Sequence, residues 1–112
     1  MAKADRLERM DNRRLELEAE YRDALIAALQ DTAKGVWGLF DHNQDRSARA
    51  RIAPVIEHLD DIAQTIDSLR QQLDLDGFDL HRDFLAARGP VSSSDVGEPK
   101  QAQAWLGKLG AP

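Results

Sequence analysis

Residues 52–73 read IAPVIEHLDDIAQTIDSLRQQL, and the spacing of the apolar residues in this stretch decides the fold. Two series of apolar side chains recur there every seven residues: Ile52, Leu59, Ile66 and Leu73 in one, and Val55, Ile62 and Leu69 in the other. Interleaved series of this kind are the a and d positions of a helix that packs along another helix. The stretch therefore predicts a long helix with a coiled-coil-like seam.

Two long helices are expected around a polar connector at residues 41–45. The first spans residues 3–40, although Gly35 and Gly38 loosen or end it, and the second spans residues 47–74. Pro54 fits the first turn of a helix, so regular helix begins near Ile52 or an earlier turn kinks there. A short connector makes the two helices antiparallel neighbours.

Two shorter helices are expected after this hairpin. Gly77 is the expected left-handed cap of the second helix, and a third helix follows over residues 79–88, burying Phe78, Leu80, Phe84 and Leu85. Residues 89–97 form a flexible linker, and residues 98–109 form a last helix with Ala102, Trp105, Leu106 and Leu109 on one stripe. The fold class is all-α: one domain, residues 1–112, built on a long antiparallel helical hairpin with two short C-terminal helices.

Two features predict a homodimer that completes a helical bundle. Residues 24–29, ALIAAL, are apolar all the way round, so either the C-terminal segments or a second subunit must cover them. The second helix is also shorter than the first and reaches back only to about Asn12. Leu7 and Met10 then lie on an overhanging edge that needs cover.

Composition excludes several classes of function. There is no cysteine, which removes disulfides and thiolate metal sites. No apolar run is long enough to span a membrane, and a cytoplasmic protein is expected. The net charge is −5, and residues 57–83 carry eight acids against two arginines, which disfavours nucleic-acid binding through that face.

The acidic and histidine-containing motifs are weak as metal or catalytic sites. Asp41-x-Asn43-x-Asp45 copies the start of a calcium loop, but Arg46 and Ile52 replace its glycine and its bidentate glutamate, so a helix-capping turn is expected. The pair His58 and Asp61 falls on the outer face of the second helix. We expect no bound metal and no cofactor.

Two further candidates for chemistry are a histidine and a serine run. His81, between Asp79 and Asp83, is a candidate general base, but it is expected on a short surface helix. Ser92, Ser93 and Ser94 lie in the expected linker, where nothing orients a nucleophile.

The candidate partner-binding residues are apolar or aromatic side chains near the ends of helices: Leu7, Met10, Trp37, Phe40 and Trp105. The alternative is that the aromatic residues close the ends of the bundle core. We interpret the chain as a non-catalytic helical protein–protein interaction module, such as an adaptor, small chaperone or assembly factor, and not as an enzyme. One alternative is a DNA-associated regulator using an anion-contacting tip at Arg46, Arg49 and Arg51. Another is a ligand-binding or enzymatic bundle without a recognisable motif.

Overall fold

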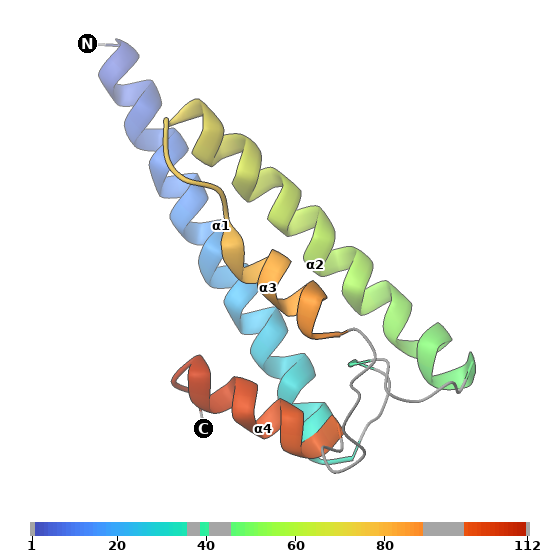
Figure 1. Cartoon of the computed structure of the whole chain (residues 1–112). Helices are drawn as coiled ribbons and strands as arrows, with labels where there is room; N and C mark the ends of the chain where they lie inside the picture. The colour runs from blue at the N-terminus through green and yellow to red at the C-terminus, as the bar shows by residue number, and fades with distance from the viewer. Residues whose placement is uncertain (1, 36–38, 41–45, 89–97, 112) are drawn as a thin grey trace.

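The computed structural model describes residues 2–35, 39–40, 46–88 and 98–111. Within these residues there are four α-helices and no β-strand: α1 (Ala2–Ala33), α2 (Arg46–Gln72), α3 (Asp79–Ala87) and α4 (Glu98–Lys108). Helices α1 and α2 lie side by side in opposite directions, and α3 folds back beside them (Figure 1). The all-helical class and the bundle-like packing of helices are thus confirmed.

The seam of α2 faces the core, as its spacing predicts. Leu59, Ile62 and Ile66 are buried, and Val55 and Leu69 are half-buried against them. His58 is exposed on the outer face, where the same spacing places it. Pro54 lies inside α2, two turns after the helix begins, so the earlier turn is part of the same helix. The sequence pattern of residues 52–73 therefore fixes which face of α2 meets α1.

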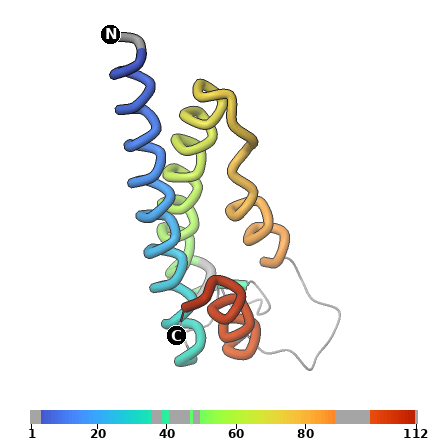
Figure 2. The backbone as a smooth tube through the Cα atoms, turned by 90° about the vertical axis from the view of Figure 1, so that its left-hand side faces the viewer, coloured from blue at the N-terminus to red at the C-terminus, as the bar shows by residue number. Residues whose placement is uncertain are grey.

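The apolar belt at residues 24–29 of α1 is covered within the chain. Leu25 and Leu29 are fully buried, and α4 lies against the C-terminal part of α1 (Figure 2). Ala102, Trp105 and Leu106 of α4 are buried in the same core. The Arg22 guanidinium donates to the carbonyl of Leu109 at 2.6 Å, which anchors the end of α4. The C-terminal helix is therefore the cover for this belt, the first of the two alternatives given by the sequence.

Helix α3 turns a different face to the core from the one predicted. His81 and Phe84 are buried, whereas Leu85 is 39% exposed and Leu80 is half-buried. The prediction that His81 lies on the surface and that Leu85 is buried is wrong. Phe78 and Phe84 direct the rotation of α3, because their rings pack edge-to-face on Tyr21 and Phe40 respectively.

Two helix ends also differ from their predicted positions. Helix α1 stops at Ala33 rather than near Phe40, because Gly35 has a φ of +114°, a conformation that ends a helix and that only glycine adopts readily. Helix α2 is closed by Asp74 in the left-handed conformation, with φ +59°, and not by Gly77. The amides of Asp74 and Leu75 bond back to the carbonyls of Gln71 and Arg70, which is the Schellman pattern.

Replacing Gly35 with alanine tests the end of α1. Since φ +114° strains any side chain, we expect Gly35→Ala to lower the free energy of unfolding by about 1–2 kcal/mol in urea denaturation. Gly107→Ala is the matched control, because Gly107 lies inside α4 with open space around it, and alanine there should add up to about 1 kcal/mol. Equal effects of the two substitutions would contradict the assignment.

Candidate functional site

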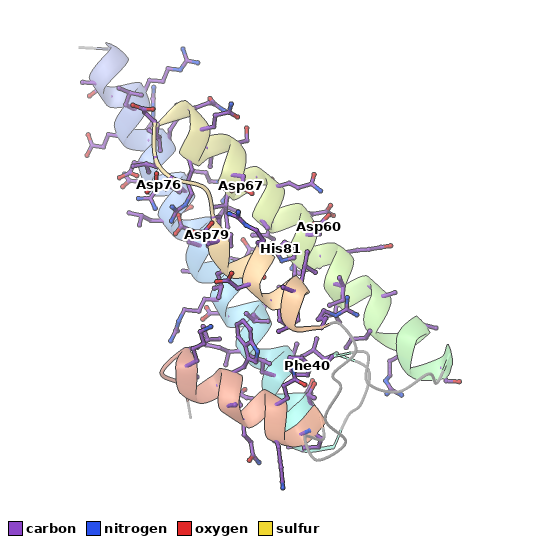
Figure 3. All side chains as sticks on the ribbon, in the orientation of Figure 1. Phe40, Asp60, Asp67, Asp76, Asp79 and His81 are labelled. Atoms are coloured by element: carbon purple, nitrogen blue, oxygen red, sulfur yellow. The ribbon has the colours of Figure 1, made fainter. Side chains whose placement is uncertain are left out.

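A buried hydrogen-bonded chain of three side chains joins α1, α2 and α3. The Tyr21 hydroxyl lies 2.7 Å from Nδ1 of His81, and Nε2 of His81 lies 3.2 Å from Oδ1 of Asp60. The ring of Tyr21 also packs edge-to-face on Phe78 at 5.0 Å. Figure 3 shows His81 on α3 beside Asp60 on α2. These contacts join Tyr21 of α1 to His81 of α3 and to Phe78 just before α3, and they join His81 to Asp60 of α2.

A neutral imidazole satisfies every donor and acceptor in this chain. In the tautomer that pairs both ring nitrogens, the phenol O–H donates to Nδ1 and the Nε2–H of the same ring donates to the Asp60 carboxylate. Burial, and then the negative charge of Asp60, raise the pKa of the Tyr21 phenol well above its usual range. Tyr21 is therefore a hydroxyl donor here and not a phenolate.

The order carboxylate, imidazole, hydroxyl is that of a general-base relay, but the hydroxyl is inaccessible. Tyr21 is fully buried, so no substrate atom reaches its oxygen, and only the Asp60 end is half-open to solvent. The carboxylate beside His81 comes from α2, whereas Asp79 of α3 pairs with Arg82. The chain of bonds holds α3 against the two long helices.

A cluster of three charged side chains fills the next level of the α1–α2 interface. Arg70 of α2 binds Glu18 of α1 through two nitrogens, at 2.7 and 3.2 Å, and Arg14 binds the same carboxylate at 2.6 Å. Arg70 also donates to the carbonyl of Asp76, at 3.0 Å. Arg14 interrupts the apolar stripe of α1 in the sequence, and this cluster is the reason that position tolerates a charge.

Glu18 is ionised because its two arginine partners lower the pKa of its carboxyl more than burial raises it. Burial by itself raises the pKa of the Glu18 carboxyl, but hydrogen bonds from Arg70 and Arg14 lower it further than burial raises it. The net result is a pKa below the ordinary value of 4.5.

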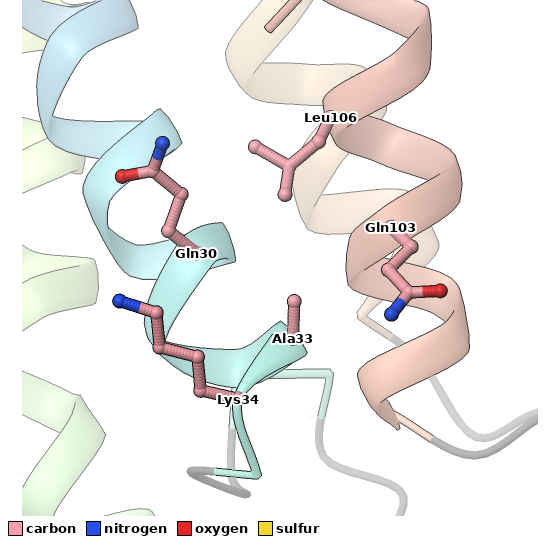
Figure 4. A pocket seen from close by; sticks show the side chains of 5 residues that line it. All are labelled: Gln30, Ala33, Lys34, Gln103 and Leu106. Atoms are coloured by element: carbon pink, nitrogen blue, oxygen red, sulfur yellow. The ribbon is translucent and has the colours of Figure 1, made fainter. Parts of the chain in front are cut away.

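Two open grooves lie on the surface of the described residues. One, of about 450 Å³, separates the end of α1 from α4 and is lined by Gln30, Ala33, Lys34, Gln103 and Leu106 (Figure 4). The other, of about 270 Å³, lies where α1 projects past α2 and is lined by Arg6, Leu7, Met10 and Gln72. None of the residues of the Tyr21–His81–Asp60 chain lines either groove. The second groove contains two of the predicted partner-binding residues.

The five predicted partner-binding residues do not form one surface. Leu7 is 41% exposed and Met10 is half-buried. Phe40 and Trp105 are buried, and each packs edge-to-face on Phe84, at 6.1 and 5.9 Å between ring centroids. They close the end of the core opposite the Leu7 groove, and Trp37 lies outside the described residues. Leu7 and Met10 are therefore the members of the set that remain at an open surface.

The predicted anion-contacting tip is described only in part. Arg46 begins α2, but nothing is described of its side chain or that of Arg49, while Arg51 is exposed. The calcium-loop motif at residues 41–45 and the serines at residues 92–94 lie outside the described residues.

The described part of the chain contains neither a cluster of metal ligands nor a membrane-spanning helix. No three histidine, aspartate or glutamate side chains gather there as a metal site requires. None of its helices combines the length and the apolar character that crossing a membrane requires.

The bond between Tyr21 and His81 predicts a coupled loss of stability. Tyr21→Phe leaves the buried Nδ1 without a donor, so we expect the free energy of unfolding to fall by about 1–3 kcal/mol. In a His81→Leu background the same substitution should cost at least about 1 kcal/mol less, because the acceptor is already gone. Chemical denaturation of the wild type, both single variants and the double variant measures this difference, and simple additivity would contradict the bond.

The Glu18 cluster predicts a loss of stability in acid. A carboxyl whose pKa is lowered by folding stabilises the protein above its unfolded pKa, near 4.5, and this contribution disappears as the pH falls through the lower folded value. Glu18→Gln should cost about 1–3 kcal/mol at pH 7 and flatten the dependence of unfolding free energy on pH below about 5. Glu16→Gln is the control: Glu16 is exposed, forms a surface ion pair with Arg13, and should behave as the wild type.

Comparison with known proteins gives no relative. No protein-family model, no curated protein and no solved structure matches this chain. Function is therefore inferred from the contacts, charges and exposed surfaces of the chain itself.

Proposed function

We propose that the chain is a non-catalytic helical interaction module that binds a protein partner through its open end. The open end is the part of the molecule where the first turns of α1 project beyond α2, next to the connector at residues 73–78 (Figure 1). The observation that carries the proposal is Leu7, an exposed leucine on the groove at this end. Adaptors, small chaperones and assembly factors all act through surfaces of this kind.

The groove continues a stripe that is core elsewhere in α1. Leu7, Met10, Arg14, Leu17 and Tyr21 follow one another at intervals of three or four residues, so they share a face of the helix. Leu17 and Tyr21 are buried against the rest of the chain. The exposed fraction of these side chains rises toward the N-terminus, because α2 ends at Gln72, beside the groove, and leaves Leu7 uncovered. An apolar edge on a helix that extends past its packing partner is suited to the docking of another helix.

The arrangement of polar groups supports a non-catalytic role. The Tyr21–His81–Asp60 chain is satisfied internally, and its hydroxyl is buried. The charges of Arg14, Glu18 and Arg70 are likewise paired within the chain. In this proposal both clusters stiffen a coiled-coil-like stem formed by α1 and α2, and the stem carries the open end toward its partner.

Site-specific photo-crosslinking in the cells that make the protein tests this proposal. A photoreactive residue replacing Leu7 should yield a discrete crosslinked species, since Leu7 lies at the proposed contact. The same residue replacing Glu16, which is well exposed on another face of α1, is the matched control and should yield none. Equal crosslinking at both positions, or none at position 7, would contradict docking at the open end.

A further inference from the structure

Two exposed leucines at the open end are flanked by charges of opposite sign. On α1, Leu7 is 41% exposed and follows Arg6, which lines the same groove. On the connector after α2, Leu75 is 44% exposed and stands between Asp74 and Asp76, both of them exposed. Glu8, the other neighbour of Leu7, is also exposed but does not line the groove. The groove edge is thus apolar and basic, and the connector edge is apolar and acidic. Figure 3 places Asp76 at this end of the molecule, away from Phe40.

These two edges do not satisfy each other within one chain. Among the described residues, Arg6 has no acidic partner, and the carboxylates of Asp74 and Asp76 have no basic one. Arg70, the arginine nearest to Asp76, is bound to Glu18 and reaches only the backbone carbonyl of Asp76. Both leucines also keep their exposure. Each edge therefore retains the groups that would complement the other.

We propose that the partner at the open end is a second copy of this chain, bound so that the Arg6–Leu7 edge of each copy contacts the Asp74–Leu75–Asp76 edge of the other. This inference rests on the proposed function and names its partner. Since both edges lie at the same end of the molecule, a two-fold axis there satisfies both contacts at once, and the assembly closes as a dimer. Burial of the leucines supplies affinity, and the charges determine which edge of one copy contacts which edge of the other.

The structure also gives a reason for the position of Asp74. The Schellman closure of α2, with Asp74 at φ +59°, carries Leu75 and Asp76 out of the helix at the end of the α1–α2 pair. Arg70 then fixes the backbone at Asp76. The acidic edge is thus built on backbone held by three hydrogen bonds, and it is presented rigidly to a partner.

Sedimentation velocity from about 1 to 100 µM tests the dimer. We expect the wild type to dimerise, and Leu7→Glu to raise the dimer Kd by roughly tenfold or more, because it removes a buried leucine and places an acid against the acidic edge. Arg6→Asp and Asp76→Arg should each weaken the dimer, and the double variant should recover at least part of the loss. Leu85→Glu is the matched control, since Leu85 is an equally exposed leucine on α3 and should leave Kd unchanged.

Three outcomes would overturn the dimer: a wild type that stays monomeric at 100 µM, a Leu7→Glu variant that still dimerises as the wild type does, or a charge swap that recovers nothing. Circular dichroism melting of each variant confirms that it is folded, which the exposure of the substituted side chains leads us to expect. A monomeric wild type that still crosslinks through position 7 in cells would remove the dimer and leave the interaction module standing. A wild type that stays monomeric and also gives no crosslink through position 7 would overturn both the dimer and the interaction module.

Discussion

Helix α1 contacts α2 along one face and α4 along another, and it needs both because its apolar residues near the C-terminal end surround the helix. Leu25 and Leu29 are completely buried, and Ile26 and Ala28 pack at the edge of the same core. A single neighbouring helix covers only one stripe of such a surface. Helix α4 therefore crosses α1 where the belt lies, while α2 continues along the side that carries Leu17 and Tyr21 and the Arg14–Glu18 pair. Helix α3 reaches α1 through side chains, chiefly at Tyr21.

Two polar clusters set the register of the bundle. The Arg14–Glu18–Arg70 cluster and the Tyr21–His81–Asp60 chain occupy successive turns of α1, and each joins α1 to α2. Apolar seams alone tolerate sliding by a heptad, because one leucine replaces another. A slide here would instead leave the half-buried Glu18 carboxylate or the buried His81 imidazole without its partner, at a cost of about 1–3 kcal/mol for each group. These clusters thus contribute more to the uniqueness of the arrangement than to its stability.

The elements predicted correctly from sequence are those whose periodicity is regular over several turns. The seam of residues 52–73 and the stripe of α4 both place their buried residues correctly, since one-sided burial leaves a repeating trace. The sequence predicts the wrong rotation for α3 because its nine residues offer too few turns, and because a histidine is more often a surface residue than a core residue. The spacing of Phe78, His81 and Phe84 was the available signal. The partners of His81 lie 21 and 60 residues away, and no local pattern identifies them.

The ends of the two long helices show the same distinction between local and distant causes. Gly35 ends α1 through its own backbone freedom. The sequence indicates that Gly35 and Gly38 loosen the helix, but it predicts the helix end near Phe40 instead of Ala33. Asp74 adopts the left-handed conformation in place of Gly77, because the hydrogen bonds back to Arg70 and Gln71 select the residue by position and not by type. The open end could be predicted in outline from helix lengths alone. The charges at its two edges could not, because the turn after α2 decides where Asp74 and Asp76 lie relative to Arg6.

The pairing of α1 with α4 has a consequence for how the chain is made. The bond from Arg22 to Leu109 spans 87 residues, so α1 finds part of its cover only after α4 has been made. A nascent chain that has completed α1, α2 and α3 still exposes the part of the residue 24–29 belt that α4 covers in the folded protein. Contacts so distant in sequence slow folding and prolong that exposure. The chain is consequently vulnerable to aggregation until α4 has been made and has docked, and truncation before α4 would make that transient state permanent.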